Sequence, residues 1–150
     1  AILGRPDIIL LDEPTVGLDI EERVRLKEML EELRGRQPII ISSHIAEDIE
    51  ATCQQVIVLQ KKHIIFAGEI EYLSSLATGH VWKIPEEIYR RQRNTCKQIG
   101  CIEENGNRLV KVLCAEKECA PDVSAVPLVP RLEDGYLYLL TKDDLNEKSI

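Results

Sequence analysis

The stretch that most constrains the fold is Ile8–Asp19, with the sequence IILLDEPTVGLD. Four bulky apolar residues lead directly into two adjacent carboxylates, Asp12 and Glu13, and a short loop then ends at Asp19. A continuous apolar run between turn residues is typical of a strand covered on both faces, as in a parallel sheet. Two neighbouring carboxylates at the end of such a strand are costly unless a positive charge compensates them. We therefore expect a metal ion that carries phosphates at this place.

The next residues alternate between helical and strand patterns. Asp19 and Glu22 have the spacing of a capping box at the start of a helix, and a basic turn at Lys61-Lys62 separates two apolar runs. The predicted elements are a helix over 20–34, a strand over 38–42, a helix over 45–52, strands over 55–60 and 63–68, and a helix over 69–77. Nearly all-apolar strands that alternate with helices indicate an α/β fold with a parallel sheet and flanking helices.

The pattern changes near Gly79, so we expect two domains, residues 1–78 and a small α+β domain over 79–150. Asn105-Gly106 between two alternating runs predicts a β-hairpin, and pairing across it puts one set of side chains on a common face: Ile99, Cys101, Val110, Val112 and Cys114. The other predicted elements are a strand over 81–84, a helix over 85–94, a loop or edge strand over 120–130, and a final helix from Leu132.

Composition excludes several classes of function. A formal net charge of −7 and a pI near 5.1 argue against unaided binding to nucleic acid or to an anionic membrane surface. No apolar run is long enough to span a bilayer. Five scattered cysteines fit a reducing compartment better than a disulfide framework, and their spacing favours buried or inert thiols over a zinc site. His63 and His80 are predicted to be a turn residue and a boundary residue.

The order of these motifs is specific. LLDEPTVGLD, then a helix, then a strand that ends in SSH at His44, resembles the ATP-binding subunits of ABC transporters, in which Walker B, the D-loop and the switch histidine follow in this order. HIIFAGEIEYLSSL is similar to the hairpin and helix that close this domain in bacterial exporters. The resemblance covers about residues 1 to 77 and implies part of a P-loop NTPase sheet.

The resemblance also implies roles for single residues. Asp12 would hold Mg²⁺ through a water molecule, Glu13 would orient the water that attacks the γ-phosphate of ATP, and His44 would contact that phosphate and the water. The loop Thr15–Asp19 resembles the D-loop, which in the family reaches across a dimer interface. Asp19 serves equally well as a helix N-cap, and both roles can hold together.

ATP and Mg²⁺ are the cofactors that the resemblance implies. Its implied partners are a second ATP-binding subunit and transmembrane permease subunits, with no nucleic acid. The protein would then be cytoplasmic and peripheral on the inner face of the cell membrane, held there by the permease.

Part of the family's machinery is missing from the sequence. No G-x-x-x-x-G-K-[ST] occurs in it, so no such loop can cradle phosphates, and the family's Q-loop and signature motif lie upstream of Walker B. With Ala1 as its first residue, the chain is expected to be a piece of a longer protein. Alone it is expected to be inactive, and to form homo-oligomers through strands that lack a neighbour.

The preferred reading is part of an ABC ATPase subunit of the drug- or peptide-export type from a bacterium. One alternative is a chromosome- or translation-associated ABC ATPase, which long coiled coils or two cassettes in one chain would favour. Another is a non-catalytic interaction or regulatory module carried by residues 80–150, which tight partner binding by that part would favour.

Overall fold

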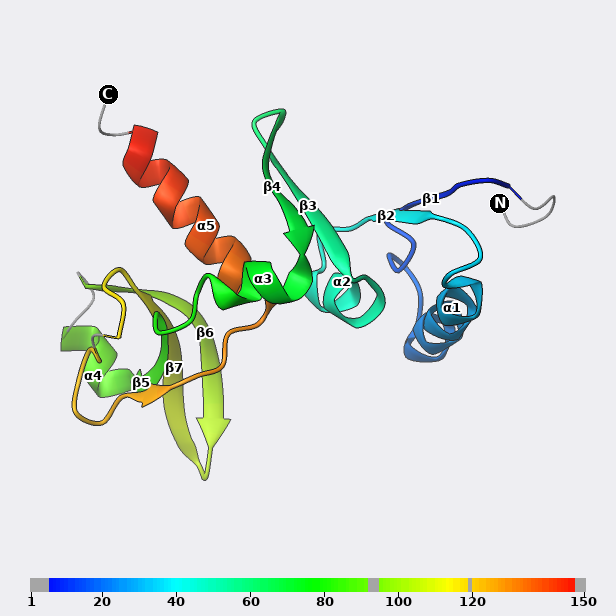
Figure 1. Cartoon of the computed structure of the whole chain (residues 1–150). Helices are drawn as coiled ribbons and strands as arrows, with labels where there is room; N and C mark the ends of the chain where they lie inside the picture. Colours follow the sequence, from blue (N-terminus) through cyan, green and yellow to red (C-terminus); the bar gives the residue numbers. More distant parts are fainter. Residues whose placement is uncertain (1–5, 92–94, 119, 148–150) are drawn as a thin grey trace. The chain divides into compact units, whose positions relative to one another are not determined.

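The computed structural model describes residues 6–91, 95–118 and 120–147. The fold is mixed α/β, and the chain divides into two compact units, residues 1–56 and 57–150 (Figure 1). The predicted boundary between two domains, after residue 78, concerns function rather than this structural division, and it stays a prediction.

In the first unit, strand β1 (Ile9–Asp12) pairs with strand β2 (Ile39–Ser42). The pairing is parallel, with Ile9 opposite Ile39 and Asp12 opposite Ser42, and the crossover between them contains helix α1 (Ile20–Leu33). Helix α2 (Ala46–Thr52) follows β2. The predicted strand, helix, strand and helix are therefore confirmed in order.

Helix α1 begins where the capping box was predicted. The Asp19 carboxylate accepts a hydrogen bond of 2.9 Å from the Glu22 N–H, and the Glu22 carboxylate accepts one of 3.1 Å from the Asp19 N–H. These bonds satisfy backbone donors that have no partner inside the helix. Capping thus fixes where the loop after Glu13 ends.

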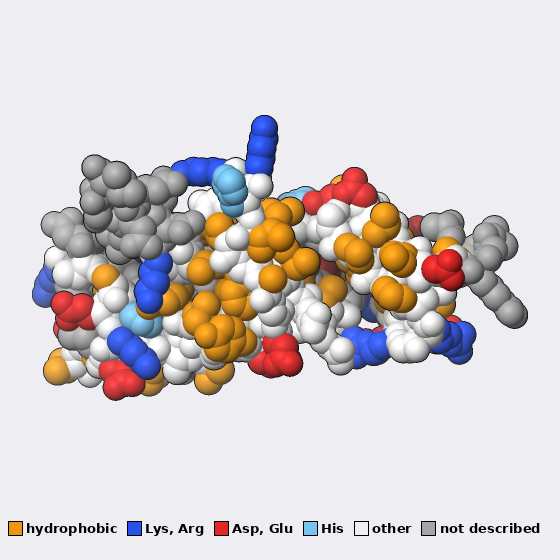
Figure 2. All heavy atoms as spheres, turned by 45° about the horizontal axis from the view of Figure 1, so that its top comes forward, with side chains coloured by type: hydrophobic (Ala, Val, Ile, Leu, Met, Phe, Trp, Pro, Cys, Tyr) orange, Lys and Arg blue, Asp and Glu red, His pale blue; other side chains and the backbone are white. Residues whose placement is uncertain are grey.

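Strands β3 (Gln55–Gln60) and β4 (His63–Glu69) form a separate two-stranded sheet. The predicted turn joins them, with both Lys61 and Lys62 at positive φ, and helix α3 (Ile70–Ser75) follows. The expected larger parallel sheet is not confirmed, because β1–β2 is the one parallel pair that the described residues form. Figure 2 shows hydrophobic side chains open on the surface. The large exposed hydrophobic residues of these four strands are Leu10, Ile40, Ile57, Leu59 and Ile64.

A four-stranded sheet of order β6-β7-β5-β8 dominates the rest of the second unit. Its strands are β5 (Val81–Pro85), β6 (Cys96–Glu104), β7 (Asn107–Cys114) and the short edge strand β8 (Val126–Pro127). Strand β7 pairs with both β5 and β6, and β5 also pairs with β8; all three pairings are antiparallel. Helices α4 (Glu86–Arg91) and α5 (Leu132–Glu147) complete the unit. The Asn105-Gly106 hairpin, the edge strand and the final helix are confirmed.

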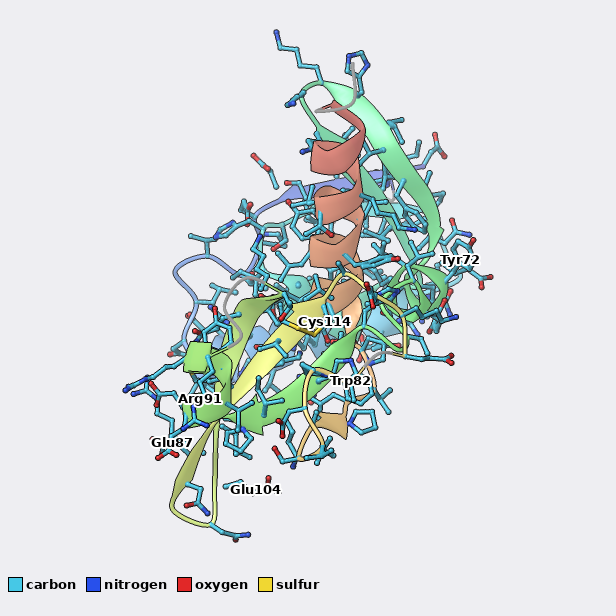
Figure 3. The ribbon with its side chains drawn as sticks, turned by 90° about the vertical axis from the view of Figure 1, so that its left-hand side faces the viewer. Tyr72, Trp82, Glu87, Arg91, Glu104 and Cys114 are labelled. Carbon is cyan, nitrogen blue, oxygen red and sulfur yellow. A yellow bond between two sulfur atoms is a disulfide. The ribbon has the colours of Figure 1, made fainter. Side chains whose placement is uncertain are left out.

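The two faces of this sheet carry separate clusters. One cluster contains the only tryptophan of the sequence and consists of these buried residues: Trp82, Ile84, Cys96, Val110, Val112 and Cys114. Figure 3 shows Trp82 and Cys114 on this sheet. The other contains Ala77, Val81 and Leu113, against which residues of α5 pack. Buried Asp134 on α5 pairs with Lys111 of β7 at 2.6 Å, so α5 is tied to the sheet by charge as well as by apolar contact.

The predicted common face of the hairpin is wrong for Ile99. An irregularity in the pairing lies between Gln98 and Gly100, so that Ile99 has no partner and packs with the cluster around Val81 and Leu113. A bulge inserts one extra residue, and a shift of one residue moves a side chain to the opposite face. Cys101 stays opposite Val110 but is exposed.

The prediction of inert thiols is wrong for Cys96 and Cys114, which form a disulfide. The two residues are directly opposite in the register of β6 and β7, with 4.3 Å between their Cα atoms. Cys53 and Cys101 have free thiols. His80 is buried, and its Nδ1 lies 2.9 Å from the carbonyl oxygen of Cys114, which fits a boundary residue with a structural role.

Candidate functional site

The candidate site lies at the carboxyl ends of β1 and β2. Because the two strands are parallel and in register, the last residue of β1, Asp12, lies opposite the last residue of β2, Ser42. The Ser42 hydroxyl donates a hydrogen bond to Oδ1 of Asp12. The exposed Asp12 carboxylate is thereby oriented at the edge of the sheet.

Glu13 leaves the strand in an unusual backbone conformation. Its φ is +45°, in the left-handed region that residues other than glycine rarely adopt. Its N–H donates a hydrogen bond of 2.9 Å to the Ser42 carbonyl oxygen, which continues the β1–β2 ladder past Asp12. Strained backbone of this kind costs about 1–3 kcal/mol and is concentrated at functional sites.

The Glu13 side chain meets His44, which follows β2 two residues after Ser42. Nδ1 of His44 lies 2.8 Å from Oε1 of Glu13. The side chains are 73% and 36% exposed, so His44 is open to a ligand. Oε2 of Glu13 is buried and has no hydrogen-bond partner among the residues that the structure describes. The structure therefore brings Asp12, Glu13 and His44 together at one edge, with one carboxylate oxygen of Glu13 held and the other unpaired.

The donor set suits a magnesium ion that brings its own phosphate ligands. In the described part of the chain, no group of three or more His, Cys, Asp and Glu side chains is placed to hold a metal ion. Mg²⁺ keeps several waters and is usually bound through one or two carboxylates together with substrate phosphates. Asp12 supplies one such carboxylate, which the Ser42 hydroxyl orients.

The loop between Glu13 and α1 is short and internally bonded. The N–H of Val16 donates to the Glu13 carbonyl oxygen at 3.1 Å, and that of Leu18 to the Thr15 carbonyl oxygen at 3.3 Å. Gly17 has φ +80°, which glycine adopts readily. Asp19 is confirmed as the N-cap of α1, while its role across a dimer interface stays a prediction.

Sequence reasoning missed three polar residues near this site. Ser42 could have been found from the register, because it is the strand-end neighbour of Asp12. Thr15 and Asp48 are 5% and 7% exposed, and no local pattern marks a threonine or an aspartate as buried. None of the helices that the structure describes is both long and apolar enough to cross a bilayer.

Comparison with known proteins finds curated relatives of the chain. No protein-family model matches the chain. It is 42% identical over 74 residues to the ABC transporter ATP-binding protein NatA of Bacillus subtilis, which is 49% of this chain and 30% of that protein.

Two further relatives align with nearly the whole chain. An uncharacterised ABC transporter ATP-binding protein of Methanocaldococcus jannaschii is 30% identical over 146 residues, 91% of this chain and 47% of that protein. The probable multidrug ABC transporter ATP-binding protein YbhF of Escherichia coli is 27% identical over 156 residues, 93% of this chain and 26% of that protein. The chain thus spans between about a quarter and a half of the length of these relatives. Together they place the chain in the family of ABC transporter ATP-binding proteins, of which it spans a part.

Proposed function

We propose that the chain is the water-activating part of an ABC transporter ATPase subunit that couples ATP hydrolysis to the export of a substrate across the membrane. The observation that carries this proposal is the 2.8 Å contact between His44 and Glu13 beside the oriented Asp12 carboxylate. A carboxylate base, a hydrogen-bond donor and a metal-binding carboxylate at one strand edge are the parts that phosphoryl transfer to water needs.

The side chains divide the chemistry between them. Glu13 would hold and polarise the attacking water, and the contact of Oε1 with His44 would orient its carboxylate. The exposed imidazole of His44 would donate a hydrogen bond to the γ-phosphate and so stabilise its negative charge. Asp12 would hold Mg²⁺ through a water molecule, and the ion would neutralise charge on the phosphate oxygens. Asp19, at the end of the D-loop, would reach the site of a second subunit.

The surroundings of the site are also part of the proposal. The first 78 residues would belong to a P-loop NTPase sheet with further parallel strands, and residues 79–150 would form an accessory domain. The partners would be a second ATP-binding subunit and transmembrane permease subunits, which would hold the protein on the cytoplasmic side of the membrane. The multidrug name of the E. coli relative, which aligns with 93% of this chain, favours export.

The isolated chain should not use ATP. Its sequence contains no Walker A loop, and two carboxylates without that loop repel a nucleotide. Titration calorimetry with Mg-ATP should show no binding tighter than about 1 mM, which corresponds to about 4 kcal/mol. A micromolar dissociation constant for the isolated chain would contradict this expectation.

The experiment that tests the function is Glu13→Gln in the longer subunit that contains this chain. Loss of a general base lowers turnover by roughly 100-fold or more, whereas ATP binding through Asp12 and Mg²⁺ should persist, so the variant should accumulate as an ATP-bound dimer. Glu21→Gln is the matched control, because Glu21 is an exposed glutamate on α1 that pairs with Arg25 of the same helix. Unchanged ATP hydrolysis by Glu13→Gln would remove Glu13 from the mechanism.

A further inference from the structure

Besides Oε2 of Glu13, two buried oxygens in the first unit have no hydrogen-bond partner among the described residues: Oγ1 of Thr15 and Oδ2 of Asp48. Thr15 belongs to the loop after Glu13, and Asp48 lies on α2, the helix that begins two residues after His44. Both side chains are more than nine-tenths buried. A buried polar atom without a partner costs about 1–3 kcal/mol, so two of them in one place call for an explanation.

Both residues line the same small cavity, and so does Lys27 of α1. Its volume is about 10 Å³, which is at the lower limit for one water molecule. A buried water needs two to four polar partners. The Thr15 hydroxyl and the Asp48 carboxylate supply two, and Nζ of Lys27, 3.7 Å from Oδ1 of Asp48, supplies a charge on the same side.

We propose that one buried water bridges the Thr15 hydroxyl and the Asp48 carboxylate, and that Thr15 and Asp48 are positioning residues for Glu13 and His44. The water accepts from or donates to Thr15 and donates to Asp48, whose negative charge Lys27 balances. The bridge fixes the loop that follows Glu13 against the helix that follows His44. Its consequence for catalysis rests on the proposed function, but the bridge itself does not.

Asp48 is well held to act as an anchor. The Thr52 hydroxyl donates to the Asp48 carbonyl oxygen at 2.6 Å, and the Asp48 N–H donates to the Ile45 carbonyl oxygen at 3.1 Å. Thr15, in contrast, lies in a loop whose internal bonds are the two turn hydrogen bonds of Val16 and Leu18. The water therefore transmits rigidity from α2 to the loop.

Thr15→Val tests the bridge by the direction of its effect. Valine has nearly the shape of threonine but no hydroxyl. If the hydroxyl bonds a water that also bonds Asp48, its loss leaves a buried group unsatisfied, and amide hydrogen exchange at Val16 and Leu18 should become about tenfold faster. If the hydroxyl has no partner, its removal relieves a penalty, and exchange should be unchanged or slower. The second result would overturn the proposal.

Thr15→Ser is the matched control, because it keeps the hydroxyl and removes only a methyl group; exchange at Val16 and Leu18 should stay within about twofold of the parent chain. Should the valine variant not fold, Asp48→Asn gives a second test, with faster exchange at the same two amides. A high-resolution crystal structure of the chain should show one ordered water within hydrogen-bond distance of both oxygens. A direct Thr15–Asp48 hydrogen bond without water would overturn the bridge.

The catalytic consequence has its own measurement. In the longer subunit, Thr15→Val should lower kcat about tenfold and leave KM for ATP within twofold, and Thr15→Ser should restore kcat. Equal kcat for both variants would overturn the positioning role. Failure of the proposed function would be seen in a different variant, because Glu13→Gln would then hydrolyse ATP normally. The hydrogen-exchange result at Val16 and Leu18 would not depend on that outcome.

Discussion

Gly135 of α5 lies directly against the backbone of Leu73 in α3. A Cβ atom built on Gly135 would come within 2.0 Å of the Leu73 carbonyl oxygen and within 2.9 Å of the Cα of Ser74. Glycine in a helix costs about 1 kcal/mol relative to alanine, so its place in the first turn of α5 is explained by this close approach of two helices.

Gly135→Ala should therefore destabilise the second unit. The methyl group would force α5 away from α3, at a cost of about 3 kcal/mol, and the better helix propensity would return about 1 kcal/mol. Urea unfolding followed by Trp82 fluorescence should show a net loss of about 2 kcal/mol. Gly100→Ala is the control, because its Cβ would meet Lys111 at an ordinary 3.6 Å. Equal midpoints for the two variants would contradict the close approach.

Reduction should destabilise the same unit. The Cys96–Cys114 disulfide closes a sequence separation of 18 residues, for which the chain-entropy estimate is about 3 kcal/mol. Dithiothreitol should lower the urea midpoint of the parent chain and of Cys101→Ser, and leave that of the Cys96→Ser/Cys114→Ser variant unchanged. An unchanged midpoint of the parent under reduction would mean that the pair does not form in solution.

The pKa of Asp122 is lowered chiefly by the hydrogen bond from the Ser124 hydroxyl, at 2.6 Å, and then by that from the Ser124 N–H, at 2.8 Å. Since the folded pKa is depressed, the stabilisation is present above the unfolded value and is lost as the pH falls through the folded pKa. Ser124→Ala should raise the pKa of Asp122 toward its ordinary value in an NMR titration. Val123→Ala, at an exposed neighbour, should not; equal pKa values in both variants would refute the assignment.

The chain should associate in solution through its exposed strands. Leu10 and Ile40 are register partners on the same face of the β1–β2 pair and are 69% and 58% exposed. Open apolar strands pair with other chains. Leu10→Lys/Ile40→Glu should shift light-scattering mass toward 17.0 kDa, and Val129→Lys, at an exposed valine outside these strands, should not. A parent chain that stays monomeric over a wide concentration range would contradict association.

Local signals predicted much of this fold. The capping box at Asp19 located α1, and Asn105-Gly106 located the hairpin, because each depends on neighbouring residues alone. The meeting of Glu13 with His44 was also predictable, since the carboxyl ends of parallel strands share one edge. What those residues do is still a prediction.

The disulfide was not predictable because it depends on the bulge. Counting back from Asn105-Gly106 without a bulge puts Lys97 opposite Cys114, whereas the extra residue at Ile99 brings Cys96 there. A bulge is stabilised by packing on both faces of a sheet, which local sequence does not encode. Burial of Thr15 and Asp48 depends in the same way on how three separate elements meet.

The positive φ of Glu13 has an evolutionary consequence. Glycine or asparagine would occupy that backbone conformation with less strain, so the carboxylate at position 13 comes at a cost in stability. Under the proposed function, a copy of this gene released from selection for hydrolysis should drift toward those residues at position 13 before the apolar strand β1 changes. Such copies would be recognisable by an intact apolar strand that leads to an altered carboxylate pair, and their proteins should unfold at higher temperature than active ones.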